Sequence, residues 1–351
     1  MVSEADRDRA VRELLERDGV RVARLKLLKA EPALVYRVRG RDGTDAVVRV
    51  RPVGGELSGR MARLQHRWMS SLAAATPPLA PKPLLLAGEP FQWVKLPGEP
   101  RRRQVAMVSW TDGRRAKDAA AFVESRRLAA VGRATAQLHR HAQSFRVGRS
   151  DGVRRFEAAH FFGGETCVGS LGRRLFAAAD FKLLRYLAGV AGEAMADVGD
   201  GRSAFGLIHA DLEPPNWLFR GRATPIDFES FGLGHYLFDL AQVLWTHAMW
   251  KEYPTYLDYF LRAYESVRPL SANERRHLTT FQMLPLIEWI TRALRRRHED
   301  DGGELRRWLP PTIKRLRELE SNRPTAAAAR EPAVAPIRRQ GELRRTARRV
   351  R

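Results

Sequence analysis

The sequence predicts an α+β fold with a small strand-rich part followed by a larger, mostly helical part. Apolar and polar residues alternate over much of 21–110, whereas helical periodicity dominates from residue 118 to about 319. The length of 351 residues also favours two cores over one. We expect a first domain over 1–110, a second over 111–321 and a separate terminal segment over 322–351.

The first part begins with a predicted helix, in which Val11, Leu14 and Leu15 recur at helical spacing before a stop at Gly19. Strand-like runs follow, namely RVARLKLL, ALVYRVRG and DAVVRVR, and the GRDG turn predicts a β-hairpin over 33–51. A helical stretch is expected over 57–75. FQWVKL and QVAMVSW are further strand candidates.

The second part is predicted to be helical over 118–145 and 171–198, with a glycine-rich irregular stretch over 146–170. Short strands are expected at GLIHA, WLFRG and TPIDFES. Helical periodicity returns from Asp239 to about Leu319, and its aromatic side chains are interpreted as core packing.

Charge is unevenly distributed along the chain. Lys and Arg number 62 against 40 acidic residues, and residues 322–351 alone carry nine Arg and two Glu. That segment has few large apolar residues, which is typical of disorder. It could bind a weak anionic partner, nucleic acid or acidic lipid, but arginine also accumulates through base composition with no partner at all.

Membrane and disulfide proteins are disfavoured. The sequence lacks a run of the ~18 apolar residues that a membrane span needs, so no integral membrane segment is expected. The first residues are charged and form no apolar leader, and the single Cys167 cannot form an internal disulfide. We therefore expect a cytoplasmic location.

Residues 206–241 contain the most informative motif. His209, Asp211 and Asn216 form an H-x-D-x-x-x-x-N pattern, and Asp227 follows in IDFE on the next strand. Phosphoryl transfer needs a carboxylate that takes the proton of an acceptor hydroxyl, together with amide and carboxylate oxygens that hold Mg²⁺ on the nucleotide phosphates. A hydrolytic metal site is less favoured, because no second histidine lies near by in the sequence.

On these residues the sequence resembles the aminoglycoside phosphotransferase and choline kinase-like superfamily, over roughly residues 21–320. The IDF-x-x-x-G-x-G-x-x-x-x-DLA run that ends at Ala241, with LHRHAQSF and AYESVRPLSANERRHL, is most similar to the stress response kinase A and type II homoserine kinase branch. The resemblance implies a two-lobed, protein-kinase-like fold. It also implies ATP-dependent, Mg²⁺-assisted phosphorylation of a hydroxyl on a small-molecule acceptor.

The same resemblance implies roles for residues of the second lobe. Asp211 matches the catalytic base, and His209 matches the residue that braces the catalytic loop. Asn216 and Asp227 match the Mg²⁺ ligands. Asp239 matches a buried structural carboxylate.

In the first lobe, Arg49 in VVRV matches the basic residue that touches the nucleotide phosphates. Arg51 lies on the same face of the strand, and one of the two arginines must face the cleft. Gln65 stands where the family has a glutamate, and its amide can hydrogen-bond Arg49. The stretch AMVSWTDGR matches the hinge, so backbone groups near Val108 and Trp110 are expected to meet adenine.

Two further positions depart from the family pattern. Pro32 and Ala33 replace small polar residues in the phosphate-covering loop, and Glu213 adds a carboxylate two residues after Asp211. A carboxylate there is unfavourable unless a metal or a cationic substrate offsets it, or unless it points to solvent. Three functions stay open: a small-molecule kinase, a protein Ser/Thr kinase of the stress response kinase type, and a non-catalytic pseudokinase or nucleic-acid-binding protein.

Overall fold

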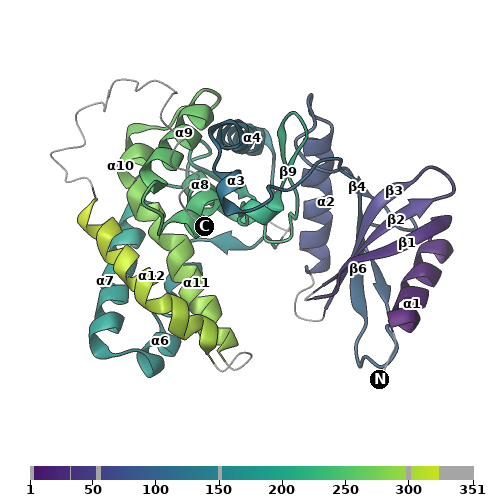
Figure 1. The fold of residues 1–351 in the computed structure, drawn as a ribbon, viewed down its shortest axis with the longest axis horizontal. Helices are drawn as coiled ribbons and strands as arrows, with labels where there is room; N and C mark the ends of the chain where they lie inside the picture. Colours follow the sequence, from purple (N-terminus) through teal and green to yellow (C-terminus); the bar gives the residue numbers. More distant parts are fainter. Residues whose placement is uncertain (1–3, 32, 53–56, 149–151, 298–301, 324–351) are drawn as a thin grey trace.

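The computed structural model describes residues 4–31, 33–52, 57–148, 152–297 and 302–323. An antiparallel sheet with one covering helix forms one side of the molecule, and a body of helices forms the other, with helix α2 standing between them (Figure 1). The predicted α+β class, with a sheet in the first part and helices in the second, is confirmed.

The main sheet is built from six strands in the order β1-β2-β3-β6-β4, with β5 paired to β6. Its strands are β1 (Val22–Lys29), β2 (Leu34–Gly40), β3 (Asp45–Arg51), β4 (Pro83–Leu84), β5 (Gln92–Val94) and β6 (Arg103–Ser109). The predicted hairpin over 33–51 is present, with Tyr36 opposite Val48. All pairings in this sheet are antiparallel, so short turns suffice to connect β1, β2 and β3.

One face of the sheet is covered by α1 (Glu4–Arg17). Helix residues Val11, Leu14 and Leu15 are buried together with strand residues such as Tyr36 and Val48. The residues that alternate with these along β2 and β3 point to the opposite face, which is turned towards α2.

Helix α2 (Gly59–Ala73) belongs to the core of the helical body and not to the core under α1. Trp68 is fully buried, and its ring packs edge-on against Phe228 at 5.5 Å between centroids. Phe231 lies on the same indole at 5.9 Å. Burial of large aromatic rings of this kind stabilises an interface more than any surface contact does.

The start of α2 is fastened to the sheet by side-chain hydrogen bonds. Ser58 caps the helix, since its Oγ accepts from the Met61 N–H at 3.2 Å. Just before the cap, the buried side chain of Gln104 on β6 accepts from Leu57 N at 3.2 Å and donates to Leu57 O at 2.9 Å. The helix therefore meets the sheet at its first residues.

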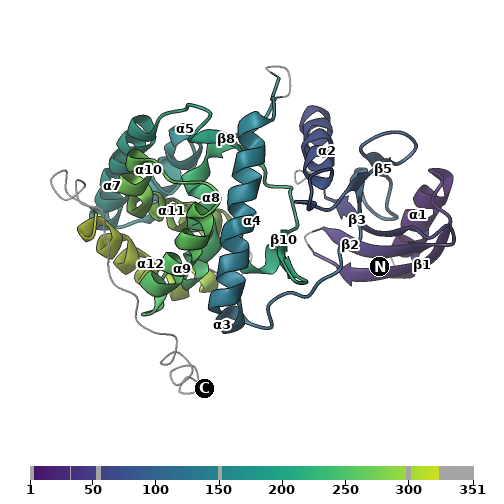
Figure 2. The same ribbon diagram turned by 90° about the horizontal axis from the view of Figure 1, so that it is seen from above.

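Within the helical body, α4 lies between the sheet and the remaining helices (Figure 2). Its helices are α3 (Ala119–Phe122), α4 (Ser125–Ser144), α5 (Ala158–Phe162), α6 (Ser170–Leu175), α7 (Ala178–Val198), α8 (Tyr236–Leu244), α9 (Tyr253–Glu265), α10 (Ala272–Phe281), α11 (Met283–Arg296) and α12 (Gly303–Ser321). Helices α4 and α9 approach closely at Gly132, where a Cβ would lie 2.4 Å from the Phe260 carbonyl oxygen. The helices predicted over 118–145 and 171–198 are present, each divided into two pieces.

Two small sheets contribute buried residues to the core of the helical body. The hairpin of β9 (Trp217–Phe219) and β10 (Ala223–Pro225) agrees with the predicted strands. The other sheet has the order β7-β11-β8, from β7 (Arg155–Phe156), β8 (Phe205–Ile208) and β11 (Gly232–His235). Strand β11 was not predicted, and the stretch over 146–170 is less irregular than expected, because it contains β7 and α5.

Among the described residues, no helix is both long enough and apolar enough to cross a membrane. The basic terminal segment predicted over 322–351 lies outside the described residues from 324 onwards, as does Pro32.

Candidate active site

The loop that follows β8 is held by a buried carboxylate. Asp239, fully buried on α8, accepts hydrogen bonds from His209 N at 2.9 Å and from Ala210 N at 2.7 Å. Ala210 has a φ of +59°, a left-handed conformation that is unfavourable for a residue with a Cβ. The two hydrogen bonds fix this conformation, and with it the direction in which the chain leaves for Asp211.

The same loop is joined to the segment after β10. Asn216 donates from Nδ2 to the Asp211 carbonyl at 2.9 Å, and its own carbonyl accepts from Ile226 N at 2.8 Å. His209 is hydrogen-bonded through Nε2 to the Ile226 carbonyl at 3.1 Å, and its ring packs on Phe228 at 4.5 Å. These contacts hold the loop with Asp211 and the loop with Asp227 as one unit.

Asp211 is half-buried and surrounded by charge. Burial, followed by the carboxylates of Glu213 and Asp227, raises the pKa of Asp211 to about 7. Arg292 on α11 opposes this shift, and its Nη2 lies 3.8 Å from Glu213 Oε1. Glu213 therefore has a cationic neighbour, which no feature of the local sequence indicates.

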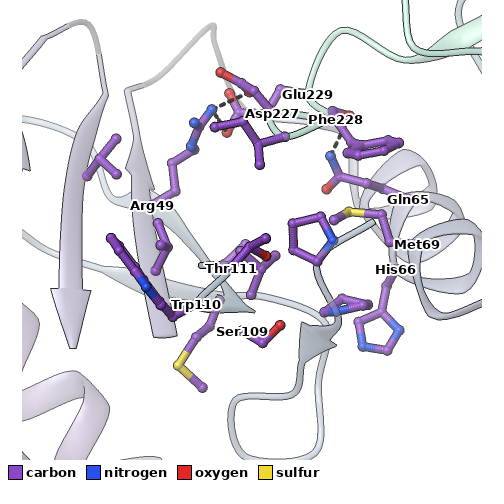
Figure 3. Close-up of a pocket in the computed structure, with 18 of the residues that line it drawn as sticks. Arg49, Gln65, His66, Met69, Ser109, Trp110, Thr111, Asp227, Phe228 and Glu229 are labelled. Atoms are coloured by element: carbon purple, nitrogen blue, oxygen red, sulfur yellow. Dashed lines mark hydrogen bonds and ion pairs between the residues drawn. The ribbon is translucent and has the colours of Figure 1, made fainter. Parts of the chain in front are cut away.

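Two arginines of β3 converge on the Asp227 loop. Figure 3 shows one of them, Arg49, with its contacts to Asp227 and Glu229. Arg49 Nη1 contacts Asp227 Oδ1 and lies 2.9 Å from Glu229 Oε1. Arg51, almost fully buried, donates from Nε to Glu229 Oε1 at 2.8 Å and from Nη1 to Gln104 Oε1 at 2.9 Å. Although burial disfavours both charges, Glu229 and Asp227 raise the pKa of Arg49, and Arg49 lowers the pKa of Asp227.

These contacts correct two expectations. Both Arg49 and Arg51 reach the cleft side, because residues two apart on a strand share a face. Gln65 donates from Nε2 to the Phe228 carbonyl at 2.7 Å, so its hydrogen bond holds the loop backbone and not Arg49. The family pattern has a glutamate at the position of Gln65, whereas here Glu229 provides the second carboxylate at Arg49.

A cavity of about 440 Å³ lies between the sheet, α2 and the Asp227 loop. Five predicted site residues line it, namely Arg49, Gln65, Val108, Trp110 and Asp227. The other three, His209, Asp211 and Asn216, are not among its lining residues and reach it only through their contacts with the Asp227 loop. Figure 3 shows Arg49 and Asp227 at one side of the cavity, with Ser109, Trp110 and Thr111 at another.

The hinge segment uses part of its backbone inside the protein. Ser109 N donates to the Lys82 carbonyl at 2.7 Å, and Trp110 N donates to the Asp45 carbonyl at 2.8 Å. These two N–H groups are engaged within the protein, so a base at the hinge would meet other backbone groups of this stretch. The guanidinium carbon of Arg37 lies 3.6 Å from the centroid of the Trp110 indole ring. Arg37 Nη2 also pairs with Asp45 Oδ2 at 2.6 Å.

The donor set near the cavity fits a magnesium ion that is shared with phosphates. Within the described residues, His, Cys, Asp and Glu side chains form no cluster of three that could enclose a metal. Mg²⁺ bound with a nucleotide needs only one or two protein oxygens, because phosphates and water supply the rest. The Asp227 carboxylate already faces a cation, Arg49, and the Asn216 amide nitrogen is engaged, which leaves its oxygen as a ligand.

Comparison with known proteins decides the family. A model of the phosphotransferase enzyme family matches residues 28–278, well over half of the chain. The chain belongs to the phosphotransferase enzyme family. The match confirms the superfamily and the transferase class that were predicted for this phosphotransferase from the 206–241 motif. No protein among those with curated functions matches the sequence.

Solved structures show the same fold for this phosphotransferase. A microcompartment-associated aminopropanol kinase superposes with a TM-score of 0.70 at 20% identity, covering 85% of this chain and 93% of that one. Amicoumacin kinase hAmiN, in complex with AMP-PNP, Ca²⁺ and Ami, gives 0.68 at 14%, covering 89% and 94%. Choline kinase LicA from Streptococcus pneumoniae gives 0.60 at 15%, covering 89% and 98%. At these identities the likeness shows the kinase-like fold.

Proposed function

We propose that this phosphotransferase transfers the γ-phosphoryl group of ATP to a hydroxyl of a small molecule, with Mg²⁺ and with Asp211 as the base. Residues 1–110 would bind the nucleotide and residues 111–321 the acceptor, in the cytoplasm. One observation carries the proposal. The Asp211 loop and the Asp227 loop are hydrogen-bonded into one unit, and that unit meets Arg49 at the edge of the cavity.

Each residue of this unit has a role that its contacts support. Asp211 would orient the acceptor hydroxyl and take its proton, since a carboxylate with a raised pKa is a better base than an ordinary one. Asn216 and Asp227 would hold Mg²⁺, which neutralises phosphate charge and orients the phosphoryl group. His209 keeps the two loops at a fixed separation through the Ile226 carbonyl.

Arg49 would exchange partners when the nucleotide binds. In the structure the guanidinium pairs with Asp227 and Glu229. An arginine fork matches phosphate as well as carboxylate, so a phosphate that enters the cavity would be able to take the place of Asp227. Glu229 would keep Arg51 as its partner during this exchange, so the Glu229 carboxylate would stay compensated.

A small-molecule acceptor is supported by the similar structures, whose names describe kinases of aminopropanol, choline and amicoumacin. On the acceptor side of Asp211, Glu213 adds a second carboxylate. Two neighbouring carboxylates favour an acceptor that brings a positive charge. The same side also carries Arg292 on α11, so the acceptor would fit between the catalytic loop and this helix.

The test measures ADP formation from MgATP with a panel of amino alcohols and other small alcohols, and in parallel with protein acceptors. Asp211→Asn should lower turnover by about 10²–10⁴-fold with ATP affinity retained, because it removes the base alone. Asp200→Asn, an exposed carboxylate outside the site, serves as the matched control. Turnover of Asp211→Asn within threefold of wild type contradicts the assignment. Phosphorylation of protein acceptors alone contradicts the small-molecule proposal.

A further inference from the structure

A line of buried polar side chains leads from the catalytic loop into the helical body, away from the nucleotide cavity. His139 Nε2 lies 3.2 Å from Asp239 Oδ2, and His139 Nδ1 lies 2.8 Å from the Tyr264 hydroxyl. Arg268 Nη1 donates to that hydroxyl at 2.8 Å, and its Nη2 pairs with Glu274 Oε1 at 2.7 Å. None of the five side chains is more than 5% exposed.

For a neutral His139, the donors and acceptors along this line permit one arrangement of protons. The ionised Asp239 carboxylate can only accept, so His139 carries its proton on Nε2 and donates it to Asp239. His139 Nδ1 then accepts from the Tyr264 hydroxyl, whose oxygen accepts from Arg268. Burial lowers the pKa of His139, which favours this neutral form.

The same group of side chains also holds the other end of β8. A nitrogen of the Arg268 guanidinium donates to the Ser203 carbonyl, just before the strand begins. The Tyr236 ring stacks on His139 at 4.6 Å and lies 4.8 Å from the Arg268 guanidinium carbon. Arg268 therefore fixes the start of β8, and the chain through His139 and Asp239 fixes its end.

We propose that His139, Tyr264 and Arg268 are positioning residues for the catalytic loop, acting through the carboxylate of Asp239. Asp239 Oδ2 accepts from both His139 and His209 N, while Oδ1 holds the strained Ala210 amide. Loss of the Tyr264 hydroxyl would remove the donor to His139 Nδ1, so the imidazole ring would no longer be held in place against Asp239. The Asp239 carboxylate could then rotate, and the backbone before Asp211 would lose its fixed direction.

The experiment compares Tyr264→Phe with Tyr253→Phe in the full chain. Both tyrosines are buried on α9, and each substitution removes one hydroxyl, but Tyr253 lies outside this line. Hydrogen–deuterium exchange of a peptide spanning 205–212 reports the His209 and Ala210 amides. Tyr264→Phe removes the bond from Arg268 and the neutral bond to His139, and only the second leads to Asp239. It should therefore speed the exchange of these amides by roughly three- to tenfold, the range that loss of one neutral hydrogen bond allows, and Tyr253→Phe should not change it.

A second pair of variants separates positioning from simple stability. His139→Gln can still present an N–H to Asp239, whereas His139→Leu cannot. We expect His139→Gln to retain more of the kcat for ADP formation from MgATP than His139→Leu, with the KM for ATP unchanged in both. Equal exchange in Tyr264→Phe and Tyr253→Phe, or equal kcat in the two His139 variants, overturns the proposal.

The effect on kcat rests on the proposed function, but the exchange measurement does not. If Asp211→Asn retains turnover while Tyr264→Phe still speeds exchange of the 205–212 amides, Asp211 is not the base and the positioning line stands. If Asp211→Asn abolishes turnover and exchange is unchanged in Tyr264→Phe, the positioning line fails alone.

Discussion

The guanidinium of Arg49 contacts the carboxylate of Asp227, the residue that we propose as a metal ligand. The contact joins a strand of the sheet to the loop after β10, so it spans the two parts of the molecule. A cation is thus present at this carboxylate before any nucleotide arrives. If ATP binds with Mg²⁺ as we propose, the ion would take the place of the guanidinium, and the Asp227 carboxylate would keep a cationic partner.

Arg49→Ala and Arg51→Ala should have different effects, although both arginines contact Glu229. Arg49→Ala removes a charge-assisted contact to phosphate, which contributes about 1.5–3 kcal/mol, so ATP affinity should fall by about 10–150-fold. Arg51 is 4% exposed and donates a hydrogen bond to Gln104 Oε1, the atom that also accepts from Leu57 N. Arg51→Ala should therefore mainly lower the melting temperature. Calorimetry and thermal unfolding of both variants check this, and a neutral Arg49→Ala would contradict it.

Gln65→Glu should not improve ATP binding, although it restores the residue type usual in the family. The substitution replaces an N–H donor to the Phe228 carbonyl with a carboxylate oxygen, and Arg49 already has two carboxylate partners. We expect a loss of about 1–3 kcal/mol in the free energy of unfolding, the cost of an unpaired buried carbonyl. Urea denaturation measures it, and a rise in ATP affinity above twofold would show that the introduced carboxylate reaches Arg49 after all.

Asp227→Ala should abolish the dependence of ATP binding on Mg²⁺, and Asn216→Ala should weaken that dependence less. A carboxylate contributes a full charge to the ion, whereas an amide oxygen contributes only a dipole. Calorimetric titration with ATP, with and without Mg²⁺, distinguishes the two variants. Equal affinity of the wild-type chain under both conditions would show that this donor set holds no metal.

Glu274→Gln should destabilise the fold more than any exposed charge substitution. Glu274 is 3% exposed and pairs with Arg268, which is 5% exposed. Removal of one partner from such a pair typically costs about 3–5 kcal/mol, because the remaining charge stays buried. Glu320→Gln, on a surface pair with Arg323, is the control with an expected cost below about 1 kcal/mol. Similar unfolding midpoints for the two variants would contradict the prediction.

Deletion of residues 324–351 should leave turnover unchanged, because the sequence of this segment has few large apolar side chains to pack. If the arginines bind an anionic partner, affinity for DNA or acidic vesicles should fall as salt rises and disappear in the truncated chain. A truncated enzyme with a sharply lower melting temperature would show that the segment packs against the body.

Strong local patterns were predicted well. The hairpin over 33–51 and α1 follow from alternation and helical spacing that tertiary contacts reinforce. Strand β11 was missed because its sequence, GLGH, has no β-branched residue. It pairs with β8 and β7 because Gly232 and Gly234 permit close approach to Arg154 and Ile208, which are remote in the sequence.

The sequence indicated candidate residues for the site, but not the contacts that those residues make. The 206–241 motif indicated Asp211, Asn216 and Asp227, since their spacing is local. Arg292 and Glu229 escaped notice for a physical reason: their importance comes from charges brought to them by α11 and β3. Charge complementarity between distant segments has no period and leaves no trace in a single sequence.

Helix α2 buries Trp68 in the helical body, and Gln104 of the sheet hydrogen-bonds Leu57 just before the helix begins. The cavity lies between this helix and the sheet. Because the sheet shares its core with α1 while α2 packs in the other core, we expect any movement between the two parts to carry α2 with the helical body. We expect the mouth of the cavity to widen and narrow as the sheet rotates about the hydrogen bonds between Gln104 and Leu57. The Arg49–Asp227 contact would hold the narrow form and would break when ATP enters.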